Sequence, residues 1–303
     1  MVTRRTLLKT TTALAALPLV PSALMAAKQD AITRAIPSSG EQLPAIGMGS
    51  SRTFDAGEGI VRKELSEVLQ LFFNNGGTLI DSSPMYGRAE KVLGDLLREV
   101  QGGESLFAAT KVWTDGKESG IQQMGVSARR MRVEKFDLMQ IHNLRDWRTH
   151  IATLKEWKAQ GKVRYIGITT SHGRFHDQLF RALQSEPFDF VQLSYSLNNR
   201  EVEKRLLPLA QDNGIATLIN RPFQRGEMFR KVKNRNLPEW AAEIDCVSWG
   251  QFFLKFILSH PAVTCIIPAT ANPHHMSDNM AAGFGGVPDA KMRMRMIEFF
   301  EKL

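Results

Sequence analysis

Short apolar runs recur along the chain after residue 45, and segments with a different periodicity separate them. The runs lie at residues 46–49, 78–80, 106–110, 136–141, 163–168, 190–193, 215–219 and 263–267. Each run is as short and as apolar as a parallel strand that is buried on both faces. Ahead of them, residues 31–36 and 42–45 flank a Pro-Ser-Ser-Gly turn, so we expect a small β-hairpin there.

The segments between the runs carry apolar residues at helical spacing. In residues 60–73 the predicted apolar stripe comprises Ile60, Val61, Leu65, Val68, Leu69, Phe72 and Phe73. Similar patterns occur near residues 89–100, 121–132, 149–160, 174–184, 200–213, 246–259 and 289–302. Strands that alternate with helices predict an α/β fold, either a (β/α)8 TIM barrel or a doubly wound sheet. No Gly-x-Gly-x-x-Gly follows the first run, and the missing dinucleotide fingerprint favours the barrel.

Composition narrows the class of protein. The 303 residues suffice for one large domain, and 43% hydrophobic with 23% charged residues is typical of a globular chain. The net charge of +8 falls to 8 − 3 = +5 when Arg4, Arg5 and Lys9 are left out. An excess of this size suits an anionic cofactor and indicates neither a nucleic-acid nor a membrane partner. Cys246 and Cys265 are expected to be buried free thiols, and no pattern indicates a metal site.

Residues 1–27 resemble a twin-arginine export signal. Paired arginines, apolar residues and a lysine occur in the segment Thr3-Arg4-Arg5-Thr6-Leu7-Leu8-Lys9. An apolar run at 13–24 and small residues at 23–27 follow, similar to a signal-peptidase site. The alternatives are a frayed basic terminus or a membrane anchor, for which the apolar run is short. The resemblance implies that the twin-arginine machinery moves a folded protein from the cytoplasm to the periplasm, with no stable membrane insertion after processing. The barrel domain then comprises residues 28–303.

Side chains able to hold or transfer protons follow three of the expected strands. Asp81 ends the second strand with Tyr86 shortly after it, Lys111 ends the third, and His142 ends the fourth. Chemistry in a (β/α)8 barrel belongs to the carboxyl ends of the strands, so these side chains should converge on one rim. Singly, each has a structural alternative as a loop carboxylate, a rim aromatic, an edge lysine or a core histidine. The ordered set indicates a catalytic site.

The segments that carry these residues resemble the signatures of the aldo/keto reductases. They read Gly77-Thr78-Leu79-Ile80-Asp81-Ser82-Ser83-Pro84-Met85-Tyr86-Gly87-Arg88-Ala89-Glu90, Thr110-Lys111-Val112 and Gln140-Ile141-His142-Asn143. Their order and spacing match the family, and the resemblance extends from Leu43 to the terminal helix. It implies a (β/α)8 barrel that reduces aldehydes and ketones, or oxidises the corresponding alcohols, by hydride transfer with a nicotinamide cofactor.

The chemistry accounts for the four residue types. Reduction of a carbonyl needs a hydride on carbon and a proton on oxygen, and a tyrosine with a pKa of about 10 is a weak acid. A lysine ammonium beside the phenol lowers that pKa, and an aspartate stabilises the buried lysine. We therefore assign Tyr86 as general acid/base, Lys111 as the group that tunes it and Asp81 as the partner of the lysine. His142 is assigned as the donor that orients the carbonyl.

By the same resemblance, the cofactor crosses the rim of the barrel. Its nicotinamide is expected near Tyr86, where Thr169-Thr170 replaces a common Ser-Asn pair beside Gln192. Asn220 stands where many members have a stacking aromatic residue, and Arg221 at the strand end is expected to contact the cofactor. The strand-eight phosphate loop and the adenine-binding helix are expected to contribute Pro268, Ala269, Thr270, His275, Asp278 and Asn279.

Two of these positions bear on the choice of cofactor. NADP-preferring members have a lysine after the proline and an arginine further on, where this chain has Ala269 and His275. A protonated His275 can still bind phosphate. NADP is therefore expected first and NAD second. The charged segment at 225–233 is either a solvated loop, which the sequence favours slightly, or a source of phosphate contacts.

The sequence says less about the substrate. Trp113, Met85 and Asn143 lie close to the catalytic residues along the chain and are candidates for the wall of the substrate pocket. The competing function is a sensor or partner-binding subunit that holds the cofactor on this fold without turning over. A panel of carbonyls and alcohols distinguishes the two, because only the enzyme turns any of them over.

Overall fold

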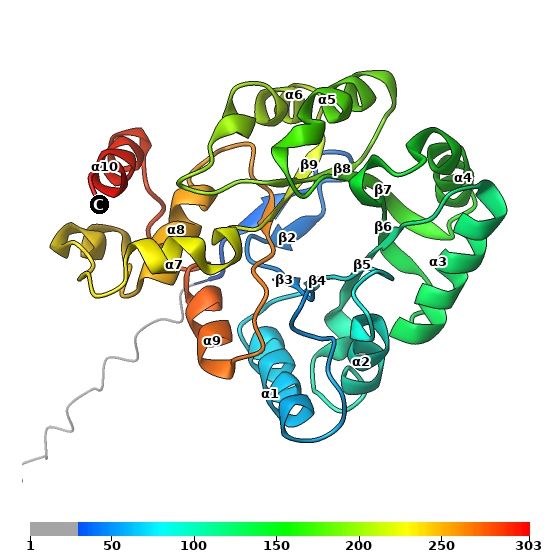
Figure 1. Cartoon of the computed structure of the whole chain (residues 1–303), viewed down its shortest axis with the longest axis horizontal. Coiled ribbons are helices and arrows are strands. Elements are labelled where there is room, and N and C mark those ends of the chain that lie inside the picture. The colour runs from blue at the N-terminus through cyan, green and yellow to red at the C-terminus, as the bar shows by residue number, and fades with distance from the viewer. Residues whose placement is uncertain (1–29) are drawn as a thin grey trace, which may run out of the picture.

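In the computed structural model, which describes residues 30–303, the expected hairpin and the eight expected strands are present (Figure 1). The hairpin pairs β1 (Thr33–Ala35) antiparallel with β2 (Gln42–Pro44). The barrel strands are β3 (Met48–Gly49), β4 (Leu79–Asp81), β5 (Phe107–Val112), β6 (Phe136–Ile141), β7 (Val163–Thr169), β8 (Phe190–Ser194), β9 (Ala216–Asn220) and β10 (Cys265–Ile266). The predicted export signal at residues 1–27 lies outside the described residues.

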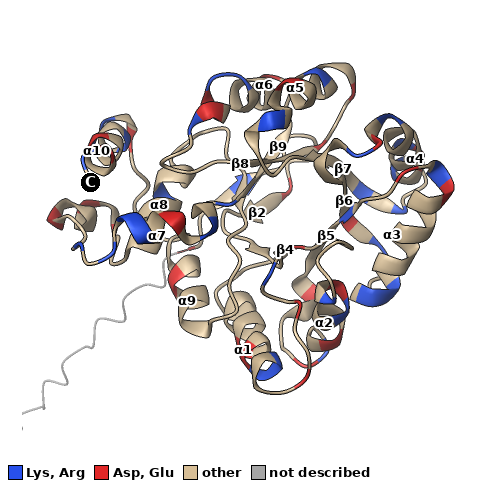
Figure 2. Ribbon diagram, viewed as in Figure 1, with Lys and Arg blue, Asp and Glu red and all other residues tan. Residues whose placement is uncertain are grey.

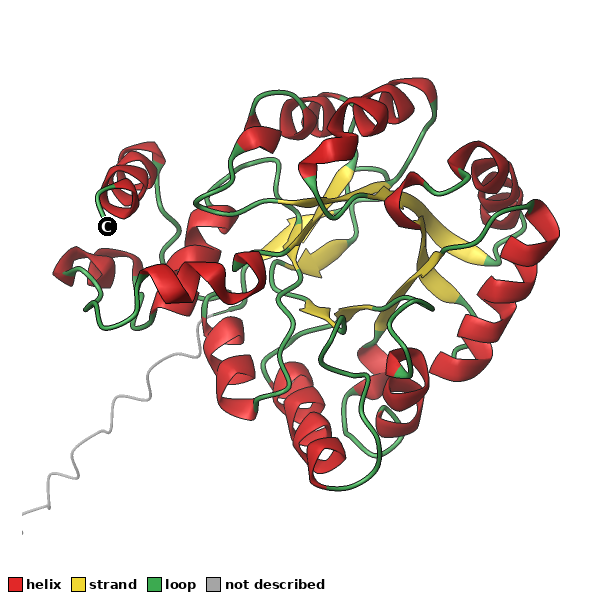
Figure 3. Ribbon diagram, viewed as in Figure 1, coloured by secondary structure: helices red, strands yellow, loops and turns green. Residues whose placement is uncertain are grey.

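The eight barrel strands run parallel and follow one another around the ring in sequence order. A parallel bridge between Ile46 and Ile266 joins the two ends of the sheet. Figure 3 shows the ring of strands with helices around it. The predicted (β/α)8 barrel with an N-terminal hairpin is confirmed. Because the strands are parallel, their carboxyl ends all meet at one rim.

Helices follow the strands as predicted, with one addition. They are α1 (Ile60–Asn74), α2 (Ala89–Leu96), α3 (Lys117–Met131), α4 (Trp147–Ala159), α5 (His176–Ser185), α6 (Leu206–Asp212), α7 (Glu227–Lys231), α8 (Trp249–Leu258), α9 (Pro273–Ala281) and α10 (Ala290–Glu301). The addition is α7, a short helix in the charged segment that the sequence read as a loop. Its two apolar side chains, Met228 and Phe229, are too few to give a helical stripe.

The buried stripe of α1 is shorter than predicted. Leu65, Val68 and Leu69 are buried, whereas Ile60 is 79% exposed and Val61 is 49% exposed. Both exposed residues lie in the first turn, ahead of the stretch that packs against the barrel. Periodicity gives the angle at which a side chain leaves the helix, but it does not show where along the helix packing begins.

Two apolar cores lie on either side of the strands. The inner core fills the barrel and contains Leu79, Phe107, Ala109, Leu138, Tyr165, Phe190, Ala216, Leu218, Cys265 and Ile267. Ile36 and Leu43 of the hairpin belong to it, and the hydroxyl of Tyr165 donates to Glu41 Oε2 at 2.6 Å in the hairpin turn. The hairpin therefore closes the amino end of the barrel. A ligand has to enter from the carboxyl rim.

Charged side chains of both signs are interspersed along the outer helices (Figure 2). Several form ion pairs between neighbouring helices, such as Arg62 of α1 with Asp95 of α2 at 2.6 Å. The positive excess is thus not gathered on a single helix in this view. Within residues 30–303, no helix has both the length and the apolar character needed to cross a membrane.

Candidate active site

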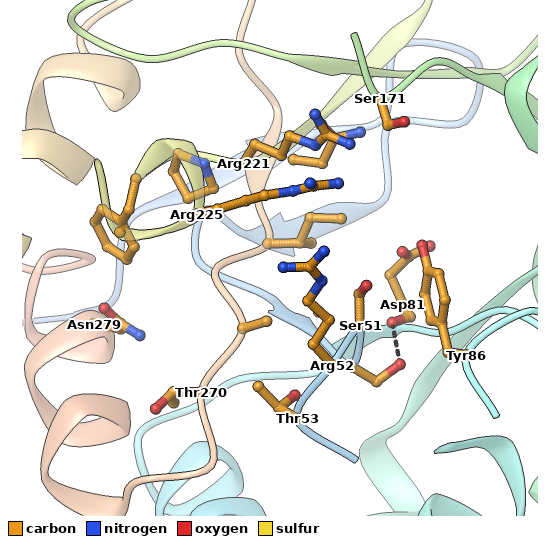
Figure 4. A pocket seen from close by; sticks show the side chains of 18 of the residues that line it. Ser51, Arg52, Thr53, Asp81, Tyr86, Ser171, Arg221, Arg225, Thr270 and Asn279 are labelled. Atoms are coloured by element: carbon orange, nitrogen blue, oxygen red, sulfur yellow. Dashed lines mark hydrogen bonds between the residues drawn. The ribbon is translucent and has the colours of Figure 1, made fainter. Parts of the chain in front are cut away.

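A cavity of about 1150 Å³ opens at the carboxyl rim, at the opposite end of the barrel from the hairpin (Figure 4). Its walls come from the ends of several barrel strands and from the loops that follow them, including the loops that begin at Gly49, Asn220 and Ile267. Cavities for drug-sized ligands measure about 300 to 1,000 Å³, so this one has room for a dinucleotide with a small substrate.

The structure brings the four predicted catalytic residues together at this rim. Lys111, near the end of β5, donates from Nζ to Asp81 Oδ2 at the end of β4, at 2.5 Å. The same Nζ lies 5.2 Å from the centroid of the Tyr86 ring. The rings of Tyr86 and His142 meet edge to face, with centroids 5.8 Å apart. Lys111 and Asp81 are fully enclosed, with side-chain exposures of 0% and 3%, so they form a buried ion pair beneath the tyrosine.

A chain of buried amides extends from this ion pair across the barrel. Asp81 Oδ1 accepts from Gln140 Nε2 at 2.8 Å and from Gln192 Nε2 at 3.1 Å. Asn220 Nδ2 at the end of β9 donates in turn to Gln192 Oε1 at 3.2 Å. Both oxygens of Asp81 are therefore occupied, which compensates for taking the carboxylate out of water. The carboxylate is fixed from four strands, β5, β6, β8 and its own β4.

Burial is the largest influence on the proton affinities here. It raises the pKa of Tyr86, and the Lys111 ammonium opposes this rise without reversing it. The predicted influence of the lysine thus has the expected sign, but the phenol does not become more acidic than usual. Burial disfavours the charge on Lys111, but Asp81 and Tyr86 together outweigh it, so the pKa of the ammonium is raised. Tyr86 is therefore protonated and Lys111 charged at neutral pH, as a proton donor and its partner need to be.

Comparison with known proteins settles the family. A sequence model of the "Aldo/keto reductase family" matches residues 45–294. The chain belongs to this family. As in the family at large, it is an oxidoreductase that depends on a nicotinamide dinucleotide and acts on carbonyl compounds.

Individual relatives agree with this assignment. The chain is 30% identical to the methylglyoxal reductase YeaE of Escherichia coli over 79% of this chain and 85% of that protein. It is 27% identical to the NADH-specific methylglyoxal reductase of the same organism, over 54% of this chain and 57% of that protein. A crystal structure of an aldo/keto reductase from Klebsiella pneumoniae with NADP and acetate is similar in fold. Its TM-score is 0.72 at 23% identity, over 86% of this chain and 93% of that one.

In this aldo/keto reductase, a serine hydroxyl lies within hydrogen-bond distance of the ring of His142. Burial, together with the charge on Lys111, holds the pKa of His142 well below its usual range, so the ring is neutral. Ser83 Oγ lies 3.0 Å from His142 Nδ1 and also accepts the backbone N–H of Met85 at 3.3 Å. Its own proton is free to point at Nδ1, and when it does so the ring proton lies on Nε2. That nitrogen can donate to a carbonyl oxygen.

Replacing Ser83 with alanine is expected to lower kcat/KM about three- to tenfold, the value of one ordinary hydrogen bond. The loss arises because nothing then holds the His142 proton on Nε2. Nitrogen NMR of the labelled ring measures the tautomer directly, and the Nδ1 signal of the variant should shift towards a mixture. Ser82→Ala removes the neighbouring hydroxyl, which bonds Ser50 rather than His142, and should leave that signal in place. An unchanged tautomer in Ser83→Ala contradicts the assignment.

Three of the residues predicted to hold nicotinamide line the cavity, but their side chains already make hydrogen bonds within the protein. Thr169, Gln192 and Asn220 line the wall. Thr169 Oγ1 accepts the backbone N–H of Asn143 at 3.0 Å, and the amide of Gln192 is engaged by Asp81 and Asn220. To contact a cofactor as predicted, each of these side chains has to bind it in addition to its protein partner or in place of that partner.

Thr170 differs from its neighbour. It is fully buried, its hydroxyl donates to the carbonyl of His172 at 2.9 Å, and it is not part of the cavity wall. Successive residues of a strand point to opposite faces, so Thr169 and Thr170 cannot both face the same ligand. The predicted Thr-Thr contact is reduced to a single threonine.

The residues predicted for the adenine end lie across the cavity from Tyr86, as Thr270 and Asn279 show in Figure 4. The cavity wall includes Ala269, Thr270, His275, Asp278 and Asn279, but not Pro268, whose carbonyl pairs with Gly49. Asp278 is engaged by the hydroxyl of Ser248 at 2.7 Å and by the amide of Gln251 at 2.8 Å. Its carboxylate therefore connects α9 to the start of α8. The hydroxyl of Thr270 bonds the backbone of Asn272, so Asn279, which has no side-chain hydrogen bond within residues 30–303, is the available polar group.

Two of the three predicted substrate contacts line the cavity. Met85 is 41% exposed there. Asn143 lies beside it, and its buried Oδ1 has no hydrogen-bond partner within residues 30–303. An unpaired buried oxygen is costly, so this atom is placed to accept from a ligand. Trp113 is not part of the wall; its ring lies 6.4 Å from that of His142 and 4.7 Å from the guanidinium of Arg145.

Sequence reasoning missed Gln140 and Arg52 at this site, whereas Arg225 belongs to the charged segment for which phosphate contacts were one of two alternatives. Gln140 lies near the end of β6, two residues before His142, and its amide reaches Asp81. Arg52 lines the cavity, on a loop that carried no motif. Both are polar residues close to strand ends, and that position was the available signal. Arg225 lines the cavity as well, which agrees with the second of the two alternatives for its segment.

Proposed function

We propose that this aldo/keto reductase reduces aldehydes or ketones with a reduced nicotinamide dinucleotide and that Tyr86 supplies the proton. The observation that carries the proposal is the buried Lys111–Asp81 ion pair at the cavity that Tyr86 lines. Its ammonium nitrogen, Lys111 Nζ, lies 5.2 Å from the centroid of the Tyr86 ring. A purely structural role does not call for a protonated phenol, a charged lysine and a neutral histidine at one ligand-accessible rim. The intact set of four also disfavours a sensor or partner subunit without turnover.

The groups around the cavity suit a dinucleotide. Arg52, Arg221 and Arg225 project into it and have no carboxylate partner within residues 30–303, so phosphate charge can be neutralised there. The free Oδ1 of Asn143 can accept from the carboxamide of a nicotinamide. Asn279 can supply a polar contact at the adenine end. A reduced nicotinamide bound in this way supplies the hydride.

NADP(H) is proposed ahead of NAD(H). The Klebsiella pneumoniae relative, similar in fold, was solved with NADP, and His275 at the cavity wall remains a candidate contact for a 2′-phosphate. NAD(H) stays the second choice because Ala269 provides no charge and one relative is an NADH-specific enzyme. Small dicarbonyls are proposed as substrates, since the Escherichia coli relatives are methylglyoxal reductases.

The protein residues divide the proton chemistry between them. His142 donates from Nε2 to the carbonyl oxygen and orients it, and Tyr86 Oη releases its proton to that oxygen as the charge develops. Lys111 stabilises the phenolate left behind, and Asp81 keeps the ammonium in place. In the direction of alcohol oxidation, the same phenolate takes the proton back.

We also propose that the protein works in the periplasm after export by the twin-arginine pathway. The support is the resemblance of residues 1–27 to such a signal. This pathway moves folded proteins, so a dinucleotide bound in the cytoplasm can accompany the chain.

One experiment tests these proposals together. The full chain is expressed in a bacterium with twin-arginine machinery, recovered by osmotic shock, and its bound dinucleotide is released and identified. We expect recovery from the periplasm, NADP(H) in excess of NAD(H), and reduction of methylglyoxal on addition of NADPH. Replacement of Arg4 and Arg5 by lysine should keep the protein in the cytoplasm. Dinucleotide binding without turnover of any carbonyl would favour the sensor function instead.

A further inference from the structure

The charges around the cavity do not balance. Three carboxylates line it, and each has its own partners: Asp55 pairs with Arg88, Asp81 with Lys111, and Asp278 with a hydroxyl and an amide. The arginines of the wall are Arg52, Arg221 and Arg225. None of these three has an ion-pair partner or a side-chain hydrogen bond within residues 30–303. The cavity therefore presents three uncompensated positive charges.

These arginines converge. Figure 4 shows Arg221 and Arg225 extending side by side into the cavity, with Arg52 reaching towards them from the other wall, on the side of Tyr86. Each has a positive φ, of 66° at Arg52, 51° at Arg221 and 57° at Arg225. Residues other than glycine rarely adopt this conformation, and such strained positions cluster at ligand sites. Like charges held together in this way repel one another until an anion joins them.

Arg221 is distinct among the three. It directly follows Asn220 at the end of β9, at the edge of the buried amide chain, and it is half-buried while Arg52 and Arg225 are exposed. Burial lowers the pKa of its guanidinium, and the neighbouring charge on Arg225 adds to this effect. Its charge is also felt at the Tyr86 phenol, where it favours the phenolate. The lack of a counter-charge is thus most costly at Arg221, because it is the most buried of the three, and its charge also acts on the proton donor Tyr86.

Charge counting separates its role from that of the other two. The pyrophosphate of a dinucleotide carries two negative charges, which the two exposed guanidinium groups of Arg52 and Arg225 can neutralise, while the 2′-phosphate of NADP(H) is proposed to bind separately, beside His275. One positive charge, that of Arg221, is then left in the cavity wall that it shares with Tyr86. A guanidinium binds carboxylates and phosphates through paired hydrogen bonds, so the chemistry of its missing partner is an anion.

We propose that Arg221 binds a carboxylate or phosphate carried by the substrate, so that the enzyme prefers acidic aldehydes and ketones to neutral ones. This inference rests on the proposed function, because it assigns the substrate class of the same site. It departs from the expectation that Arg221 contacts the cofactor.

Two pairs of aldehydes test the preference. Glyoxylate carries a carboxylate where methylglyoxal carries a neutral acetyl group, and succinate semialdehyde is compared with its methyl ester. We expect the wild-type enzyme to favour the acid of at least one pair in kcat/KM. Arg221→Gln should reduce kcat/KM for that acid about 10- to 100-fold, the range for a lost charged hydrogen bond, and change the neutral partner little. Arg221→Lys should lose less than Arg221→Gln, because lysine keeps the positive charge although it lacks the paired N–H donors of a guanidinium.

Two further variants locate the effect. Arg225→Gln is expected to weaken NADPH binding, measured by nicotinamide fluorescence, and to slow both members of each pair alike. Arg230→Gln is the matched control, because Arg230 is exposed on α7 in the same segment and is not part of the cavity wall. It should alter neither binding nor preference. Equal losses for acid and neutral aldehydes in Arg221→Gln, together with weaker NADPH binding, place Arg221 on the cofactor and overturn the proposal.

A binding measurement separates this inference from the proposed function. Oxamate carries a carboxylate beside an amide and cannot be reduced at that position, so its affinity for the complex with the dinucleotide can be measured by calorimetry. Binding that disappears in Arg221→Gln supports the anion subsite even if the wild-type protein reduces no carbonyl. Reduction of neutral aldehydes with no oxamate binding and no acid preference keeps the proposed function and refutes the subsite.

Discussion

Replacing Tyr86 with phenylalanine is expected to lower kcat about 10²- to 10⁴-fold, the usual contribution of a general acid. The change removes the only atom of the side chain that carries a proton to the carbonyl oxygen. It keeps the aromatic ring, which packs edge to face on His142 with centroids 5.8 Å apart. Dinucleotide affinity, measured by nicotinamide fluorescence, should therefore stay within about twofold of wild type, as expected for a loss confined to the transition state.

Tyr165→Phe is the control for this variant. It removes a phenol at the closed end of the barrel, where the hydroxyl bonds Glu41 in the hairpin turn. We expect this variant to be less stable but to turn over at the wild-type rate. Wild-type turnover in Tyr86→Phe would show that the proton comes from another group.

The fold was predictable because a barrel strand is recognisable by itself. The run at residues 136–141 coincides with β6, and every other run overlaps a strand. A strand buried on both faces needs apolar side chains throughout, so its pattern does not depend on its neighbours. Surface elements lack such independence, since α7 has too few apolar residues to be recognised and the exposed first turn of α1 carries Ile60 and Val61.

The residues of the site also divide into some that the sequence could assign and others that it could not. Asp81, Tyr86, Lys111 and His142 could be assigned because each sits at a fixed place relative to a strand end. The partners of Gln192 could not, because its amide meets Asp81 from a strand far away in the chain. Arg52 and Arg225 approach each other from loops after different strands, and only the closed barrel brings these loops together. Loop conformation depends on tertiary contacts, which the local sequence does not reveal.

Replacing Asp81 with asparagine is expected to destabilise the fold by about 3 to 5 kcal/mol at neutral pH. This is the usual cost of removing one partner of a buried ion pair, because the other charge stays buried without compensation. The ammonium of Lys111 is completely enclosed and loses its negative partner, while the shape of the side chain stays nearly the same. Turnover should also fall, because the lysine no longer holds its charge beside Tyr86. Urea unfolding measures the first effect, and kcat measures the second.

The pH dependence of stability identifies the cause. In the wild type, the pKa of Lys111 is raised above its ordinary value of 10.5. Its charge therefore stabilises the fold below that value, and this stability is lost as pH rises through the raised pKa. In Asp81→Asn, the carboxylate no longer opposes burial, and the phenol of Tyr86 is uncharged between pH 7 and pH 9, so burial lowers the pKa of Lys111. The unfolded chain then binds more protons than the folded one between the lowered value and 10.5, so the stability of the variant rises with pH in that window.

The gap in unfolding free energy between the wild type and Asp81→Asn should thus narrow from pH 7 to pH 9. Asp115→Asn removes an exposed carboxylate paired with Arg145 at 2.6 Å, and it should change stability little at either pH because solvent screens this pair. A gap that stays constant or widens between the two pH values would mean that the destabilisation does not come from the charge on Lys111. The loss would then belong to the hydrogen bonds that Asp81 accepts from Gln140 and Gln192, which an asparagine only partly reproduces.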